Sequence, residues 1–122
     1  MHELSIAESI LDIAAREAAT HRAAAVTAIK IRLGDFTGVV REALEFAFEI
    51  ARQGTIAASA TLEIERVPLR TRCPACEMPG ASGYCFICER CGTPLEILSG
   101  REMQLESIEM AEEEEVTWIA SP

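Results

Sequence analysis

Two Cys-x-x-Cys pairs constrain the fold of this chain more than any other feature. Cys73 and Cys76 form the first pair, Cys88 and Cys91 form the second, and eleven residues separate the pairs. This spacing lets the intervening loop fold back, so that four thiolates surround one ion in a tetrahedron. A closed site of this kind stabilises a fold and leaves no open coordination position for catalysis. The pattern therefore predicts a structural zinc module.

A fifth cysteine makes the choice of ligands less direct. Cys85 lies three residues before Cys88, so these two residues also have the Cys-x-x-Cys spacing. Glycine follows Cys91, and a glycine there can adopt a positive φ and turn backbone amides toward the sulfurs. We therefore assign Cys73, Cys76, Cys88 and Cys91 to zinc, with Cys85 as a free thiol or an alternative ligand. Iron in the same cage stays open, because tetrahedral thiolates suit both metals.

Length, charge and composition limit the class of protein. The 122 residues suit one domain with a small subdomain, and a hydrophobic content of 49% is enough for a core. The formal net charge of −9 argues against nucleic-acid binding, because lysine and arginine supply most of the affinity for phosphates. The cysteine pattern, together with the lack of a signal peptide and of a long apolar run, predicts a reduced cytoplasmic protein outside the membrane.

Hydrophobic periodicity predicts two helices and three strands. The segment Ser5 to Glu8 has the form of a capping box, and apolar residues at helical spacing behind it predict a helix over residues 4–20. A second helix is expected over residues 39–53, where Phe46 and Phe48 widen the apolar stripe. Alternation of apolar and polar residues predicts strands over 29–33, 62–65 and 101–110.

The order of these elements predicts an α+β fold. Two helices on one face of a three-stranded sheet bury the apolar stripes in the simplest way, and a zinc-ribbon-like module with four cysteine ligands is inserted between the second and third strands. In the third strand the apolar phase slips between Leu105 and Ile108, which predicts a bulge or a change of packing partner. We expect an α+β domain over 1–69 and 101–122, and a zinc-binding domain over 70–100.

The N-terminal tripeptide Met1-His2-Glu3 offers a second kind of metal site. A free α-amine, the imidazole of His2 and deprotonated backbone amides can place three or four nitrogens in one plane. Such nitrogen sets favour Ni(II) or Cu(II) over zinc. A histidine at position 2 is more often a simple exposed residue, so the residues alone leave both interpretations open.

Several segments, taken together and in order, form a pattern that is more specific than any one of them. They are the start Met1 to Ser5, the loop Gly34 to Val39, the segment Glu42 to Glu49, the paired cysteines, and the stretch Leu95 to Gly100. In this order, and from Met1 to about Met110, they resemble the HypA/HybF family of nickel metallochaperones for [NiFe]-hydrogenase maturation. The combination is much more specific than any single motif.

The resemblance implies that the protein carries Ni(II) as cargo, contains zinc as a structural cofactor and is not an enzyme. It implies a nickel domain whose donors are the amine of Met1, the amide and imidazole of His2 and the amide of Glu3. It also maps the zinc ligands onto the two Cys-x-x-Cys pairs. The implied partners are the GTPase HypB and the [NiFe]-hydrogenase large-subunit precursor, to which nickel is delivered.

An alternative function is a zinc-ribbon protein-interaction module without nickel transport, for which an extra residue before Met1 changes nothing. An enzyme is least expected, because the chain has no Ser/His or Cys/His pair with a base at hand and no glycine-rich phosphate loop. The chain also departs from the usual second pair of the family, Cys-Pro-x-Cys-Gly. Glu89 stands in place of the proline, and Cys85 adds a thiol upstream.

Overall fold

The computed structural model describes residues 3–81 and 85–112, which fall into two compact units. Unit 1 consists of the described parts of Met1–Ile31, Val39–Ile64 and Leu105–Pro122. Unit 2 consists of Arg32–Gly38 and the described parts of Glu65–Gln104. The chain therefore changes unit four times, inside β1, β2 and β6 and once in the loop between Gly38 and Val39, and not at a single linker. No helix in the described part of the chain is long and apolar enough to cross a membrane.

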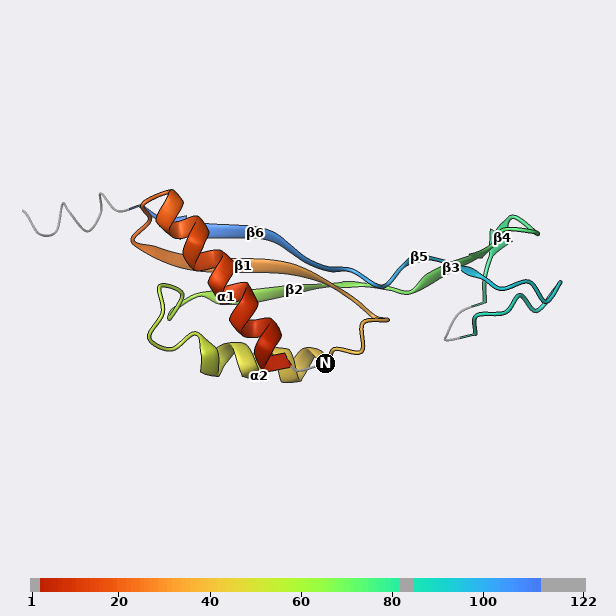
Figure 1. Ribbon diagram of the computed structural model, residues 1–122, viewed down its shortest axis with the longest axis horizontal. Coiled ribbons are helices and arrows are strands. Elements are labelled where there is room, and N and C mark those ends of the chain that lie inside the picture. Colours follow the sequence, from red (N-terminus) through yellow and green to blue (C-terminus); the bar gives the residue numbers. More distant parts are fainter. Residues whose placement is uncertain (1–2, 82–84, 113–122) are drawn as a thin grey trace, which may run out of the picture. The chain divides into compact units, whose positions relative to one another are not determined.

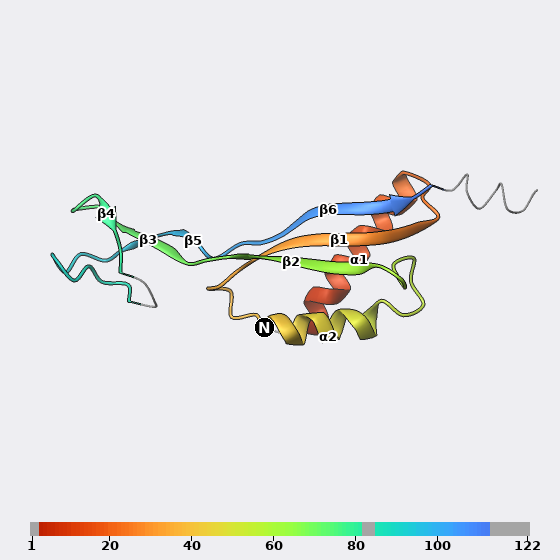
Figure 2. The ribbon, with the colours of Figure 1, turned by 180° about the vertical axis from the view of Figure 1, so that it is seen from behind.

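The fold is α+β, as expected, with two helices on one face of a three-stranded sheet. Helix α1 spans Glu3–Thr20 and helix α2 spans Arg41–Ala51. The sheet has the strand order β2-β1-β6, and its strands are β1 (Ala25–Gly34), β2 (Thr61–Val67) and β6 (Met103–Ala111). Helix α1 lies in front of these strands in Figure 1 and behind them in Figure 2, and it packs against α2.

The core of unit 1 lies between the helices and the central strand β1. Each helix contributes residues spaced by three or four, which is the spacing of one helical face. The buried residues are Ala7, Ile10, Leu11, Ala14 and Ala18 of α1, Leu44, Ala47 and Phe48 of α2, and Val26, Ile29 and Ile31 of β1. Phe48 is the largest fully buried side chain among them.

The exposure of Phe46 shows that the expected apolar stripe of α2 was too wide. Phe46 is 68% exposed, whereas Phe48 is 1% exposed. Two residues that are two positions apart on a helix point about 200° away from each other, so they do not face the same core. Ile50, another apolar residue of α2, is 51% exposed. The buried face of α2 is therefore narrower than the sequence indicated.

The helix ends also differ from the expected ones. Helix α1 already contains Glu3, so Ser5 lies inside its first turn, and the predicted capping box is wrong. The N-cap of α2 is Val40, whose side chain makes no cap. The backbone N–H of Val40 instead donates to Glu3 Oε2 at 3.3 Å. A carboxylate from α1 thus satisfies a free donor at the positive end of α2.

Strand β6 shows the expected slip in its pattern of burial. Leu105 and Ile108 are both half-buried, and two exposed residues lie between them. A regular strand would bury every second residue on one face. The apolar residues of β6 therefore do not belong to one unbroken alternation.

Unit 2 contains a second small sheet that the sequence did not predict in detail. Strand β3 (Arg70–Cys73) is central and pairs antiparallel with β4 (Met78–Pro79) and β5 (Glu96–Ser99). Cys73 is the last residue of β3 and lies opposite Met78 of β4. The first cysteine pair is therefore held in the turn of a short hairpin.

Backbone packing in unit 2 requires glycine at position 34. A Cβ atom on Gly34 would overlap the carbonyl oxygen of Gly100. The close approach is maintained by hydrogen bonds of 2.7 Å from Gly34 N to Glu102 O and from Phe36 N to Gly100 O. This packing joins the end of β1 to the segment before β6.

Side chains of the segment Arg32–Gly38 contact residues of the segment that contains the cysteines. The rings of Phe36 and Phe86 lie 5.2 Å apart at a tilt of 52°, and the guanidinium of Arg101 lies 5.8 Å from the Phe36 ring. Arg66 donates to both carboxylate oxygens of Asp35, and these hydrogen bonds lower the pKa of Asp35. These contacts explain why Arg32–Gly38 belongs to unit 2.

Candidate metal centre

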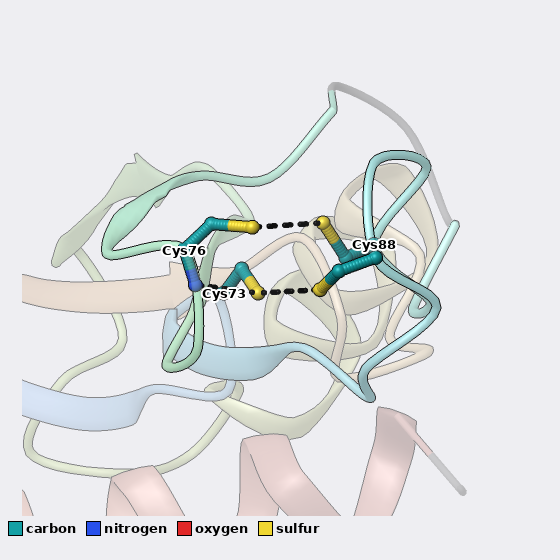
Figure 3. Close-up of side chains that lie close together, drawn as sticks. Cys73, Cys76 and Cys88 are labelled. Carbon is teal, nitrogen blue, oxygen red and sulfur yellow. Dashed lines mark hydrogen bonds between the residues drawn. The ribbon is translucent and has the colours of Figure 1, made fainter.

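Four cysteine sulfurs converge in unit 2. Cys73 Sγ lies 3.6 Å from Cys91 Sγ, Cys76 Sγ lies 4.0 Å from Cys88 Sγ, and all four sulfurs lie within 4.8 Å of one another. Figure 3 shows the sulfurs of Cys73 and Cys76 pointing across to the segment that carries Cys88. Tetrahedral zinc with Zn–S bonds of about 2.3 Å separates its sulfurs by about 3.8 Å. The cluster therefore fits zinc and is a four-cysteine zinc-binding site.

The two cysteine pairs fold into the same kind of turn. The N–H of Glu77 donates to the carbonyl of Cys73, and the N–H of Gly92 donates to the carbonyl of Cys88, both at 2.8 Å. Each donor follows its pair directly and has a positive φ, +55° at Glu77 and +75° at Gly92. The positive φ expected at Gly92 is confirmed. Sequence reasoning missed Glu77, because a glutamate gives no signal for a left-handed conformation.

Hydrogen bonds and neighbouring sulfurs shift the pKa values of the cluster in opposite directions. Thr93, whose Oγ1 lies 3.1 Å from the sulfur, lowers the pKa of Cys91 to about 6. The interaction with Cys91 raises the pKa of Cys76 to about 11. Thiols at this distance resist joint ionisation, because their negative charges repel each other. A divalent cation offsets this repulsion, so metal binding and thiol ionisation are coupled.

Cys85 lies outside the cluster. Its side chain is exposed, and its Sγ donates to the carbonyl of Ile87 at 3.4 Å. The residue between them, Phe86, accepts a hydrogen bond from Leu95 N at 2.8 Å and stacks on Phe36. Of the two roles considered for Cys85, the geometry favours the free thiol.

Of the expected nickel residues, the structure describes Glu3. Met1 and His2 lie outside the described residues. Glu3 is the first described residue of α1, and its carboxylate accepts the hydrogen bond from Val40 N. The donor expected from Glu3 is its backbone amide, which this side-chain contact does not occupy.

Replacing Gly92 with alanine is expected to weaken zinc binding about fivefold, which corresponds to about 1 kcal/mol. Among the described residues no atom lies within 4 Å of an added Cβ, so the expected cost arises from the positive φ. Competition with a chromophoric chelator measures the affinity. Gly54→Ala is the matched control, because Gly54 has a φ of +76° and equally open surroundings in unit 1. An equal loss of zinc affinity in both variants contradicts this account.

The sheet, the two helices and the cysteine cluster together define a small zinc-binding α+β protein. A family model described as hydrogenase/urease nickel incorporation, metallochaperone, hypA matches residues 1–110. The chain belongs to this HypA family, which confirms the resemblance seen in the motifs. The family handles nickel, so the alternative of an interaction module without nickel transport is not favoured.

Individual relatives agree with the family model. The hydrogenase maturation factor HypA of Synechococcus elongatus is 41% identical over 111 residues, which cover 90% of this chain and 99% of the relative. That of Chloroflexus aggregans is 43% identical over 112 residues, covering 89% and 98%. The solution structure of the Ni metallochaperone HypA from Helicobacter pylori superposes with a TM-score of 0.67 at 26% identity, covering 93% of this chain and 100% of that one. These relatives are named as maturation factors and a metallochaperone.

Proposed function

We propose that this protein binds Ni(II) at its N-terminus and delivers it during [NiFe]-hydrogenase maturation, while a structural zinc ion stabilises unit 2. The observation that carries the proposal is the match to the HypA family over residues 1–110, which includes Met1-His2-Glu3. A planar set of nitrogen donors suits Ni(II), and the chain can supply such a set at this tripeptide.

The nickel donors in this proposal are the amine of Met1, the amide and imidazole of His2 and the amide of Glu3. The position of Glu3 supports it. The hydrogen bond from Val40 N to the Glu3 carboxylate fixes the third residue of the set against the first turn of α2. Fixing one residue reduces the conformational entropy that nickel binding must overcome.

The zinc ligands in this proposal are Cys73, Cys76, Cys88 and Cys91, and Cys85 is left as a free thiol. Unit 1 then carries the nickel site and unit 2 the zinc site. The proposed partners are the GTPase HypB and the hydrogenase large-subunit precursor. The protein acts in the cytoplasm, where thiols stay reduced and available to zinc.

His2→Ala is expected to abolish tight nickel binding and to leave one zinc per chain. The imidazole is the one side-chain donor of the proposed nickel set, and zinc is bound by sulfur elsewhere. Metal analysis and Ni(II) titration of untagged protein, followed by the absorption of square-planar nickel, measure both metals.

The chain offers two controls for this experiment. His21→Ala removes the only other histidine and is expected to leave the titration unchanged. One alanine added before Met1 displaces the terminal amine and is expected to weaken nickel binding as strongly as His2→Ala does. Equal nickel uptake by the wild type and His2→Ala moves the nickel site away from the N-terminus.

A further inference from the structure

The small sheet of unit 2 has an open face that carries arginines. Along β3, Thr71 and Cys73 are buried, whereas Arg70 is exposed and Arg72 is half-buried. Successive side chains of a strand point to opposite faces of a sheet, so the two arginines lie on the face opposite to Cys73. The open face is therefore separate from the face that contributes to the cysteine cluster.

The two edge strands of this sheet add exposed apolar side chains. On β5, Glu96 lies opposite Arg72, and Leu98 follows two residues later, so Leu98 shares the open face with the arginines. Leu98 is 59% exposed, and Met78 of β4 is 49% exposed. Arginine and large apolar side chains are the residue types that are enriched where proteins bind other proteins.

Two hollows on unit 2 meet at Arg70 and Leu98. One hollow has a volume of about 520 Å³ and extends to Met78 of β4. The other has a volume of about 440 Å³ and extends to Arg32 of β1. Arg70 and Leu98 line both hollows, which therefore form one groove, named here the Arg70 groove. Every residue that lines it belongs to unit 2.

Three of the four arginines that line the Arg70 groove pair with carboxylates of unit 2. These ion pairs are Arg32–Glu65 at 3.4 Å, Arg66–Asp35 at 2.6 Å and Arg72–Glu96 at 3.1 Å. The fourth, Arg70, pairs with no described carboxylate. Glu102 also lines the groove, but its carboxylate accepts a hydrogen bond from Gly100 N at 2.7 Å. Arg70 is thus the position where a carboxylate from another molecule finds a cation without displacing an ion pair of the described residues.

We propose that the Arg70 groove binds an extended acidic peptide segment of a partner protein, with a carboxylate on Arg70 and an apolar side chain on Leu98. Neighbouring strands lie about 4.8 Å apart, and residues two apart in an extended chain lie about 6.8 Å apart, so such residues reach both positions. A lone anion leaves Leu98 and Met78 uncovered, and one unpaired arginine does not compensate a nucleic-acid backbone. The inference goes beyond the proposed function, because no proposed metal ligand lines the groove.

An NMR titration of zinc-loaded full-length protein tests this proposal. The probe is the capped peptide Glu-Ser-Leu-Ser-Glu-Ser-Leu-Ser, which places glutamate and leucine on one side of an extended chain. The Nε–Hε signal of Arg70 and the methyl signals of Leu98 are expected to shift with one common dissociation constant, while the signals of unit 1 stay in place. A second peptide with serine in place of both leucines is expected to bind about fivefold more weakly, because it buries less apolar surface.

Substitutions in the groove are paired with substitutions in unit 1. Arg70→Gln is expected to weaken peptide binding about threefold, and Arg70→Glu about tenfold, because the reversed charge also repels the peptide. Arg22→Glu is the matched control, since Arg22 is an exposed arginine of unit 1, and its effect is expected to stay within about twofold. Leu98→Ala is expected to weaken binding about threefold, and Ile13→Ala, at a 44% exposed residue of α1, to leave it unchanged. One zinc per chain verifies that each variant folds.

Four results overturn the proposal. They are no shift at Arg70, equal losses in Arg70→Glu and Arg22→Glu, shifts of the same size with inorganic phosphate, and self-association that Arg70→Glu abolishes and the peptide blocks. The second result means a general effect of charge, the third means that an anion alone binds, and the fourth means that a second copy of the chain occupies the groove. None of them bears on the nickel titration of His2→Ala, so failure of this inference is distinguishable from failure of the proposed function.

Discussion

Replacing Cys88 with serine is expected to remove zinc from the protein and to unfold unit 2, while unit 1 keeps its helices and core. The Cys88 side chain is 4% exposed and lies inside the sulfur cluster. Structural zinc contributes about 10–16 kcal/mol of apparent binding free energy, which is also folding free energy. Strands β3, β4 and β5 have four, two and four residues, too few for a sheet that is stable by itself.

Zinc analysis measures the loss of the metal, and amide hydrogen exchange measures the unfolding of each unit separately. Exchange is expected to become fast throughout the described part of unit 2 and to stay slow in the buried strand β1 and the two helices. Cys85→Ser is the matched control, since Cys85 lies three residues away and is exposed. It is expected to keep one zinc and the exchange pattern of the wild type. Retention of zinc by Cys88→Ser, or its loss from Cys85→Ser, contradicts the ligand set.

Phe48→Ala is expected to destabilise unit 1 by about 3–5 kcal/mol. Phe48 is 1% exposed and is the largest fully buried side chain among the described residues, so its removal leaves a cavity in the core of unit 1. This loss is comparable with the whole stability of many small domains, which is about 5–15 kcal/mol. Urea denaturation followed by far-ultraviolet circular dichroism measures the change.

Phe46→Ala provides the control within the same helix. The substitution is chemically identical, but Phe46 is 68% exposed, so the expected change is within about 0.5 kcal/mol. The difference between the two variants isolates the contribution of burial from that of helix propensity. Similar losses at both positions would mean that α2 does not present the described face to the core.

The sequence was sufficient for the order and type of the main elements, because their signals are local. The alternation of Ile29, Ile31 and Leu33 predicted a strand, and β1 contains it. The same alternation did not predict that the strand begins at Ala25, since the additional residues have no such alternation and are held by pairing within the sheet. Strand length was thus decided by tertiary structure.

The four cysteines of the zinc-binding site could also be predicted from the sequence, because their signal is local. Each pair closes a turn over three residues, so spacing alone brings two sulfurs together. Other features of unit 2 depend on residues far apart in the sequence. Phe36 packs on Phe86, and Arg90 reaches Pro79, and neither contact has a local signal.

The N-terminal ends of the two helices show the limit of local patterns. A capping box is read from four neighbouring residues, and Ser5 to Glu8 satisfied that pattern although α1 already contains Glu3. At the start of α2 the structure uses a cap from another helix, because Glu3 of α1 accepts the hydrogen bond of Val40, the N-cap residue of α2. No rule based on neighbouring residues identifies such a cap.

The division of unit 2 into two chain segments has a consequence for cleavage of the backbone. The chain passes between the units after residues 31, 38, 64 and 104. A single cut at any of these passages divides the backbone of unit 1 into two pieces, which only noncovalent packing then holds together. The continuous piece 65–104, if excised, would lack Phe36 and Asp35 and therefore the partners of Phe86 and Arg66. Neither half of this protein is an independent module that can be inherited or transplanted as one stretch of gene.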